Sequence, residues 1–161
     1  MSIVSNSSPL IALSAINSLD LLHALYDIVR IPEAVYQEVA VNGAGRRGAT
    51  TIANTPWIVR HAVKDQQTVS QLQSAGLNQG ESEVIALALE LSASLLILDE
   101  RHARTIARDR NLQVTGTLGV LIAAKDAGLF TEIKPLLDQL HTSGFYISPQ
   151  IIAHALHLAG E

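Results

Sequence analysis

Residues 95–99 read Leu95-Leu96-Ile97-Leu98-Asp99, four apolar residues followed by an acid, and this stretch determines the fold class. A short continuous apolar run is typical of a strand covered on both faces, as in a parallel sheet flanked by helices. A helical pattern resumes at once over residues 99–110. The stretch therefore predicts a buried strand that leads directly into a helix, the repeating unit of an α/β fold.

The same alternation of strand and helix continues on both sides of this stretch. Further strands are expected at residues 3–5, 28–31 and 57–59, and a short one that ends at Val114. Ser8 is expected to cap the first helix, with Pro9 in its first turn. Helical patterns cover residues 9–16, 19–25, 32–41, 65–75, 81–91, 117–127, 133–141 and 149–158, with an extended piece at 145–147. The order predicts a three-layer α/β/α sandwich with a mainly parallel central sheet.

The chain shows no internal repeat and no linker. Residues 1–161 are therefore expected to form a single domain, with C-terminal helices from about residue 131. The absence of Cys excludes a disulfide-stapled secreted scaffold, and a content of 48% hydrophobic and 16% charged residues excludes a disordered chain. The longest apolar stretch is interrupted by Glu90, and no Lys or Arg precedes Arg30. We expect a cytoplasmic protein without a membrane partner. Apolar C-terminal helices also suggest a homodimer.

Polar side chains follow two of the expected strands. Asn6 comes after the first strand and Asp99 after the buried one. Ligands of open parallel sheets bind beyond the carboxyl ends of the strands, where loops and helix N-termini converge. Glu81 and Glu83 begin the preceding helix, and Glu38 lies close to the apolar stripe of the helix after the second strand. Carboxylates that share a crevice repel one another unless a hard cation neutralises them, so the set predicts Mg²⁺ or a similar ion.

Each acid also has a purely structural interpretation. The helix macrodipole favours acids in a first turn, which accounts for Glu81 and Glu83 without any ligand. Glu38 fits a solvated helix position. Asp99 is the acid for which ligand binding is favoured, because it directly follows a buried strand at the sheet edge.

Four of the eleven Lys and Arg residues lie within residues 101–110. Arg101, Arg104 and Arg108 recur at three- and four-residue spacing, so they share a helix face that could hold the phosphates of a substrate. The alternative is a solvated face paired with Glu100 and Asp109. The net charge of -4 gives no overall attraction for nucleic acid, so binding would depend on this patch. The few aromatic residues predict no base-stacking platform.

Three other patterns are weaker. Residues 43–48 match G-x-G-x-x-G, but a helix precedes them where a dinucleotide site needs a strand, so a loop is expected. His154 and His157 have no third ligand nearby and are expected at the surface. A phosphorylated receiver domain would need a Lys just after Val114, whereas the next one, Lys125, lies inside a helix.

Five motifs occur in a fixed order along the chain. They are NSSPL at residues 6–10, PEAVYQEV at 32–39, GESE at 80–83 followed by IALA at 85–88, LDE at 98–100 and TGTLG at 115–119. Together they resemble the PIN-domain superfamily, and more narrowly its uncharacterised PIN-like branch related to toxin–antitoxin ribonucleases. The resemblance runs from Ile3 to about Gly160, nearly the whole chain.

The resemblance implies a metal-dependent ribonuclease in which three or four acids hold one or two Mg²⁺ or Mn²⁺ ions. RNA would be the substrate, and an antitoxin protein is the partner of many relatives. Matched position by position, the acidic set is Asn6, Glu38, the pair Glu81 and Glu83, and Asp99. Which member of the pair faces the metal stays open, with Glu81 preferred.

The chain departs from the acidic pattern at Asn6. An amide oxygen can coordinate a hard cation but brings no negative charge, so the site should hold its ions more weakly. Ser7 matches a hydroxyl residue of the family that would bind a metal-bound water or a phosphate. Two functions follow: an endoribonuclease that attacks a phosphodiester with a metal-activated water, or an RNA- or protein-binding module that keeps the fold with weak or no catalysis.

Overall fold

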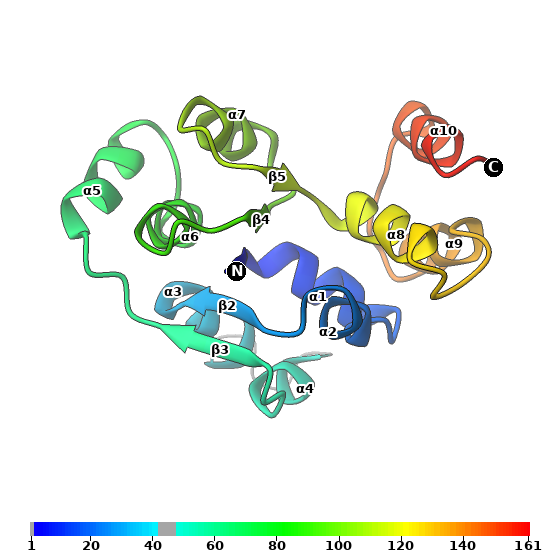
Figure 1. Cartoon of the computed structure of the whole chain (residues 1–161), viewed down its shortest axis with the longest axis horizontal. Coiled ribbons are helices and arrows are strands. Elements are labelled where there is room, and N and C mark those ends of the chain that lie inside the picture. Colours follow the sequence, from blue (N-terminus) through cyan, green and yellow to red (C-terminus); the bar gives the residue numbers. More distant parts are fainter. Residues whose placement is uncertain (1, 42–47) are drawn as a thin grey trace.

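Five parallel strands form the centre of the molecule in the order β3-β2-β1-β4-β5 (Figure 1). The computed structural model describes residues 2–41 and 48–161. The strands are β1 (Ile3–Ser5), β2 (Val29–Pro32), β3 (Ile58–His61), β4 (Leu95–Ile97) and β5 (Val114–Thr115). The α/β fold with a parallel central sheet is confirmed.

Helices cover both faces of this sheet. Helices α1, α2 and α4 lie on one side and α5, α6 and α7 on the other, while α8, α9 and α10 extend beyond β5 (Figure 1). The helices are α1 (Ser7–Ala15), α2 (Asp20–Tyr26), α3 (Glu33–Tyr36), the π-helical turn η1 (Gln37–Val41), α4 (Ala49–Ala53), α5 (Gln66–Ser74), α6 (Gln79–Glu90), α7 (Arg101–Asp109), α8 (Thr117–Asp126), α9 (Lys134–Thr142) and α10 (Pro149–Leu158). The predicted three-layer arrangement follows from this distribution.

The strand order reverses between β1 and β4. From β1 the chain adds β2 and β3 on one side, and then crosses back to add β4 and β5 on the other. Where the order of a parallel sheet reverses, the connections leave in opposite directions and open a crevice beyond the carboxyl ends of the strands. In this fold the crevice lies beyond Ser5 and Ile97, which pair with each other across β1 and β4.

The hydrophobic core extends from β1 to α10. Its fully buried side chains include Leu10, Ile31 and Leu96, which come from α1, β2 and β4. Within the two described ranges no single helix is long and apolar enough to cross a membrane. Helices α1 and α2 together meet that length and composition, but they are bent by 119° at the break between them.

The first helix begins earlier than expected. Asn6, with extended backbone, is the N-cap of α1, and Ser8 is already the second helical residue. The prediction of Ser8 as the cap is therefore wrong. Both serines fit a first turn, whose N–H groups need no partner inside the helix. Pro9 becomes the third helical residue, a position where its missing N–H also costs no intrahelical bond.

Two further segments differ from the sequence interpretation. The expected helix over 32–41 is divided into α3 and the π-helical turn η1. Helix α4, only five residues long, was not predicted because it is too short to show a period. Residues 145–147, expected as an extended piece between two helices, lie in neither a helix nor a strand. The G-x-G-x-x-G pattern falls mostly on residues 42–47, which lie outside the described residues.

Candidate functional site

Asn6 and Asp99 leave the sheet side by side where the strand order reverses. The Asn6 N–H donates to the carbonyl oxygen of Ile97 at 2.9 Å, continuing the register of β1 against β4. The Leu98 N–H donates to the carbonyl oxygen of Thr115 at 2.8 Å, so the end of β5 lies on the other side of Asp99. The two residues that sequence analysis assigned to strand ends therefore emerge at the crevice, as the topology requires.

The Asp99 carboxylate is held by the start of α8. It accepts hydrogen bonds from the Thr117 N–H at 2.7 Å and from the Thr117 hydroxyl at 2.6 Å. A carboxylate is favoured there by the helix dipole. A Cβ on Gly116 would lie only 2.5 Å from Oδ1 of Asp99, so a larger residue here would force the Asp99 carboxylate to shift. Asp99 is nevertheless exposed, and solvent reaches the crevice at this point.

The amide oxygen of Asn6 has no partner in the part of the chain that the structure describes. The residue is 7% exposed, and Oδ1 is buried without a hydrogen bond from the described part of the chain. An N-cap side chain normally accepts from the second or third helical N–H. Pro9 occupies the third position and has no N–H to give. A buried acceptor left unpaired costs about 1–3 kcal/mol, so this oxygen is suited to a bound cation or donor.

Glu38 reaches the same edge from the π-helical turn η1. The Ser7 hydroxyl donates to Oε2 of Glu38, so the start of α1 and the turn after β2 are joined through side chains. A Cβ on Gly80 would meet the Glu38 carboxylate, with the carboxyl carbon at 3.1 Å. Single π-helical turns are frequent at functional sites. Glu38 thus lies between the starts of α1 and α6.

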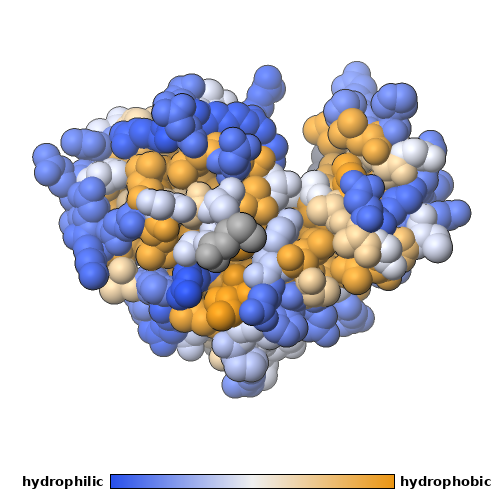
Figure 2. All heavy atoms as spheres, in the orientation of Figure 1, coloured by the Kyte–Doolittle hydropathy of each residue, from blue (hydrophilic) through white to orange (hydrophobic). Residues whose placement is uncertain are grey.

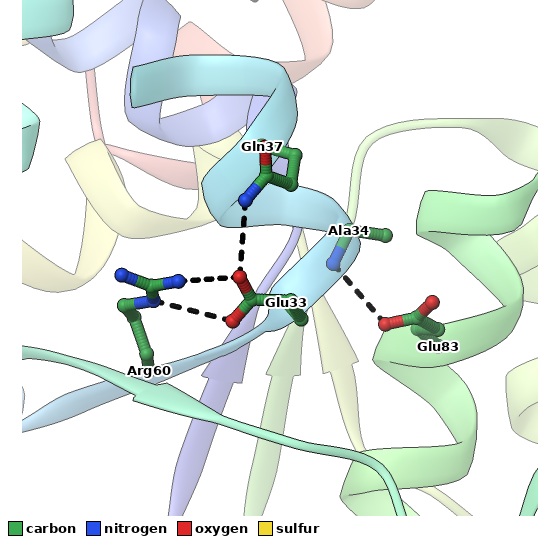
Figure 3. A network of polar contacts seen from close by, with 5 residues as sticks. All are labelled: Glu33, Ala34, Gln37, Arg60 and Glu83. Carbon is green, nitrogen blue, oxygen red and sulfur yellow. Dashed lines mark hydrogen bonds and ion pairs between the residues drawn. The ribbon is translucent and has the colours of Figure 1, made fainter. Parts of the chain in front are cut away.

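The carboxylates of Glu81 and Glu83 both accept hydrogen bonds from backbone N–H groups. Oε1 of Glu81 accepts from the Asn78 N–H at 3.0 Å, and the Glu81 N–H donates to Oδ1 of Asn78 at 2.8 Å, which forms a capping box for α6. Oε1 of Glu83 accepts from the Ala34 N–H at 3.1 Å, and its Oε2 from the Gln79 side chain. Figure 3 shows Glu83 directed at the start of α3. Both oxygens of Glu83 are engaged, whereas the capping box uses Oε1 of Glu81.

Glu33, the acid that begins α3, is neutralised by a neighbour. Glu33 accepts hydrogen bonds from Arg60 and from Gln37, the latter at 3.0 Å (Figure 3). The Arg60 guanidinium, which also lies 3.7 Å above the Tyr36 ring, holds the pKa of Glu33 below its usual range. Glu38 is therefore the acid of this segment that remains for the crevice.

The side chains around the crevice form only part of a binding site for a hard cation. In residues 2–41 and 48–161 no three His, Cys, Asp or Glu side chains lie close enough together to hold a metal ion. The oxygens around the crevice are nevertheless of the type that Mg²⁺ and Mn²⁺ prefer. Asn6 contributes the unpartnered Oδ1, with the carboxylates of Glu38 and Asp99 reaching the edge from other elements. The donor chemistry fits a cation, and the open arrangement fits weak binding.

A basic groove begins at Asp99. This cavity of about 500 Å³ lies between α7 and α10, and Figure 2 shows the molecule hollowed there. Arg101, Arg104 and Arg108 all line it, on the shared face that their spacing predicts. Nη1 of Arg104 donates to the Leu98 carbonyl oxygen at 3.1 Å, and burial together with Arg108 lowers the pKa of Arg104. Arginine stays charged in proteins, so the groove attracts anions.

Several site residues carried no role in the sequence interpretation. Thr117 and Gly116 stand in the quoted TGTLG motif, whose position between a strand and a helix was the available signal. Gly80 precedes the paired glutamates in the sequence. Its lack of a side chain leaves room for the Glu38 carboxylate, which comes from a distant part of the sequence. His154, expected at the surface, lines the basic groove. Tyr146 borders the crevice from a segment with no periodic pattern.

A family model described as a PIN domain matches residues 2–161. No curated protein matches the chain. The family match spans the whole crevice, from Asn6 to the basic groove.

Proposed function

The chain belongs to the PIN-domain family, and from this premise we propose that it is a metal-dependent endoribonuclease that hydrolyses RNA phosphodiester bonds. One observation carries the proposal. The amide oxygen of Asn6 is buried without a partner among the described residues, at the reversal of strand order where Asp99 also leaves the sheet. A fold that leaves a buried acceptor unpaired at its ligand-binding edge is suited to a bound cation there.

The residues would divide the work as follows. Asn6, Glu38 and Asp99 would hold Mg²⁺ or Mn²⁺, with Glu81 or Glu83 as a further ligand. When bound, the ion supplies an activated water and neutralises the leaving oxygen of the phosphodiester. Ser7 keeps Glu38 in place through its hydroxyl. Arg101, Arg104 and Arg108 would hold the flanking phosphates in the basic groove.

A second function, an RNA- or protein-binding module with weak or no catalysis, is favoured by two observations. Asn6 is uncharged where the family pattern has an acid, and both Glu81 and Glu83 already accept backbone N–H bonds. Recruiting Glu83 to a metal would break its bond to Ala34, which costs free energy. Both proposed functions use the same crevice, and they differ in whether bound RNA is cleaved.

A cleavage assay on single-stranded RNA with Mg²⁺ or Mn²⁺ separates the two functions. We expect weak cleavage by the wild type, none by Asp99→Asn and stronger cleavage by Asn6→Asp. Asp109→Asn is the matched control, because it makes the same exchange at an exposed position on α7. Undiminished cleavage by Asp99→Asn would reject the site. Tight RNA binding without cleavage by any variant would favour the binding module.

The partners are a further part of the proposal. We propose that the chain is the toxin of a toxin–antitoxin pair, acts on RNA in the cytoplasm and forms a homodimer. Support for a protein partner comes from exposed apolar side chains outside the basic groove, among them Ile28, which is 40% exposed, and Val41, which is 48% exposed. Growth arrest on expression in a bacterial host, relieved by Asp99→Asn, would support the toxin role. A monomeric mass by light scattering would reject the dimer.

A further inference from the structure

Two cavities lie on either side of Asp99. The basic groove is one of them, and the other, of about 520 Å³, lies between α1, α8 and the segment before α10. Asp99, Leu118 and Ile151 line both, so they form a ridge between the cavities. We call the second cavity the aromatic hollow, because Phe145 and Tyr146 line it.

The two cavities differ in chemistry. The basic groove presents three arginines, whereas the aromatic hollow presents mainly apolar side chains. Tyr146 is 79% exposed, and Ile11 on the facing helix is 38% exposed. At that exposure most of the Tyr146 side chain is open to solvent, so it can contact a ligand in the cavity that it lines. A cavity of this size accepts a flat heterocycle.

A basic groove beside an aromatic hollow fits one kind of polymer. Single-stranded nucleic acid is bound by a positively charged groove for the backbone together with aromatic rings on which bases stack. A duplex keeps its bases stacked and paired, and therefore has no base to place in a hollow. The arginines also favour an anionic occupant over an apolar helix, because an apolar surface offers no acceptor to the guanidinium groups beside it.

We propose that the aromatic hollow binds one unstacked base of single-stranded RNA, with Tyr146 as the stacking residue, while the basic groove holds the adjoining phosphates. The RNA then crosses the ridge at Asp99, so the bond beside the stacked base lies at the crevice. The proposal rests on the proposed function for the choice of RNA, and it adds a base-binding subsite beside the crevice. Tyr146 is a specificity residue that leaves the metal ligands untouched.

Binding measured without catalysis tests this proposal. A short single-stranded RNA carrying one 2-aminopurine is titrated with wild-type protein in the presence of EDTA, and fluorescence anisotropy and base quenching are recorded. We expect Tyr146→Ala to weaken binding about tenfold and to remove the quenching, and Tyr146→Phe to keep both. Leu129→Ala, an exposed apolar residue that lines neither cavity, is the matched control. The Tyr146 effect should vanish with an RNA that is abasic at the labelled position.

Other outcomes overturn the proposal or separate it from the nuclease. Unchanged RNA affinity in Tyr146→Ala, with a lower mass by light scattering, would make the hollow a protein interface. An equal loss of affinity for duplex and single-stranded RNA would reject base stacking. Tyr146-dependent binding by a protein that cleaves nothing would uphold the stacking residue and reject the nuclease, so the two proposals fail independently.

Discussion

Both oxygens of Asp99 accept hydrogen bonds from a single residue, Thr117, through its N–H at 2.7 Å and its hydroxyl at 2.6 Å. The acid at the end of β4 is therefore fixed by the first residue of α8. This fixed orientation is what a cation ligand requires, because a carboxylate locked by neighbours loses little freedom on binding. It also gives Asp99 a structural role that must be separated from catalysis.

Thr117→Val separates the two roles of Asp99. The substitution removes the hydroxyl bond but keeps the backbone bond, so we expect a loss of stability of about 1 kcal/mol and a clear drop in RNA cleavage. The measurements are thermal unfolding and the initial rate of cleavage. Thr105→Val is the control, because the Thr105 hydroxyl donates within α7 to the Arg101 carbonyl oxygen at 3.2 Å. Full activity in Thr117→Val would show that Asp99 needs no orientation.

Gly80→Ala should separate stability from activity. Gly80 is helical, and alanine is the better helix former by about 1 kcal/mol. The new Cβ would nevertheless meet the Glu38 carboxylate, the movable end of a flexible side chain. We expect a protein of equal or higher melting temperature with reduced cleavage, because Glu38 is pushed away from Ser7. Ser82→Ala, which removes a buried hydroxyl without a partner in the described chain, is the control and should keep activity.

Local patterns in the sequence were sufficient for the fold and for part of the site. The apolar run at β4 and its acid Asp99 are local signals, and the parallel strand order places Asn6 beside them. The engagement of Glu83 by Ala34 was not readable, because it joins residues 49 positions apart. The close approach of Gly80 to Glu38 could not be predicted either, because the two residues are far apart in the sequence. The aromatic hollow was missed because few aromatic residues can still gather at one place.

Pro9→Ala tests why the Asn6 oxygen is unpaired. Alanine supplies an N–H at the third position of α1, which Oδ1 of Asn6 can then accept as an ordinary helix cap. We expect Mn²⁺ to bind more weakly to Pro9→Ala and more tightly to Asn6→Asp than to the wild type. Electron paramagnetic resonance of free Mn²⁺ measures both. Unchanged Mn²⁺ binding in both variants would show that this oxygen is not a ligand.

Glu81→Gln and Glu83→Gln test which of these two glutamates is the further ligand of the proposed metal ion. Glutamine also completes a capping box, so Glu81→Gln should change stability by no more than about 0.5 kcal/mol. Both oxygens of Glu83 already accept bonds, whereas the capping box uses only Oε1 of Glu81. We therefore expect Glu81→Gln to lose more cleavage than Glu83→Gln. The reverse order, at equal stability, would assign the metal to Glu83.

Glu161 makes the C-terminal helices sensitive to acid. Its carboxylate accepts from the Ile133 N–H at 2.8 Å and pairs with Nζ of Lys125 at 3.0 Å, which joins the end of α10 to α8 and to the start of α9. These donors, first the Ile133 N–H and then Lys125, hold the pKa of Glu161 below its usual range. A pKa lowered by folding contributes stability above the unfolded value, about 4.3 for glutamate, and this contribution is lost as the pH falls through the folded value.

Thermal unfolding of the wild type and Glu161→Gln across pH 3 to 7 measures that contribution. We expect the wild type to have the higher melting temperature at neutral pH, and the difference to shrink as the pH falls below about 4.3, because the protonated wild type then resembles the amide. Asp138→Asn is the control, since Asp138 forms an exposed pair with Lys134 at 3.4 Å and such pairs add little. A constant difference between wild type and Glu161→Gln at all pH values would mean that the charge of Glu161 does not hold the helices together.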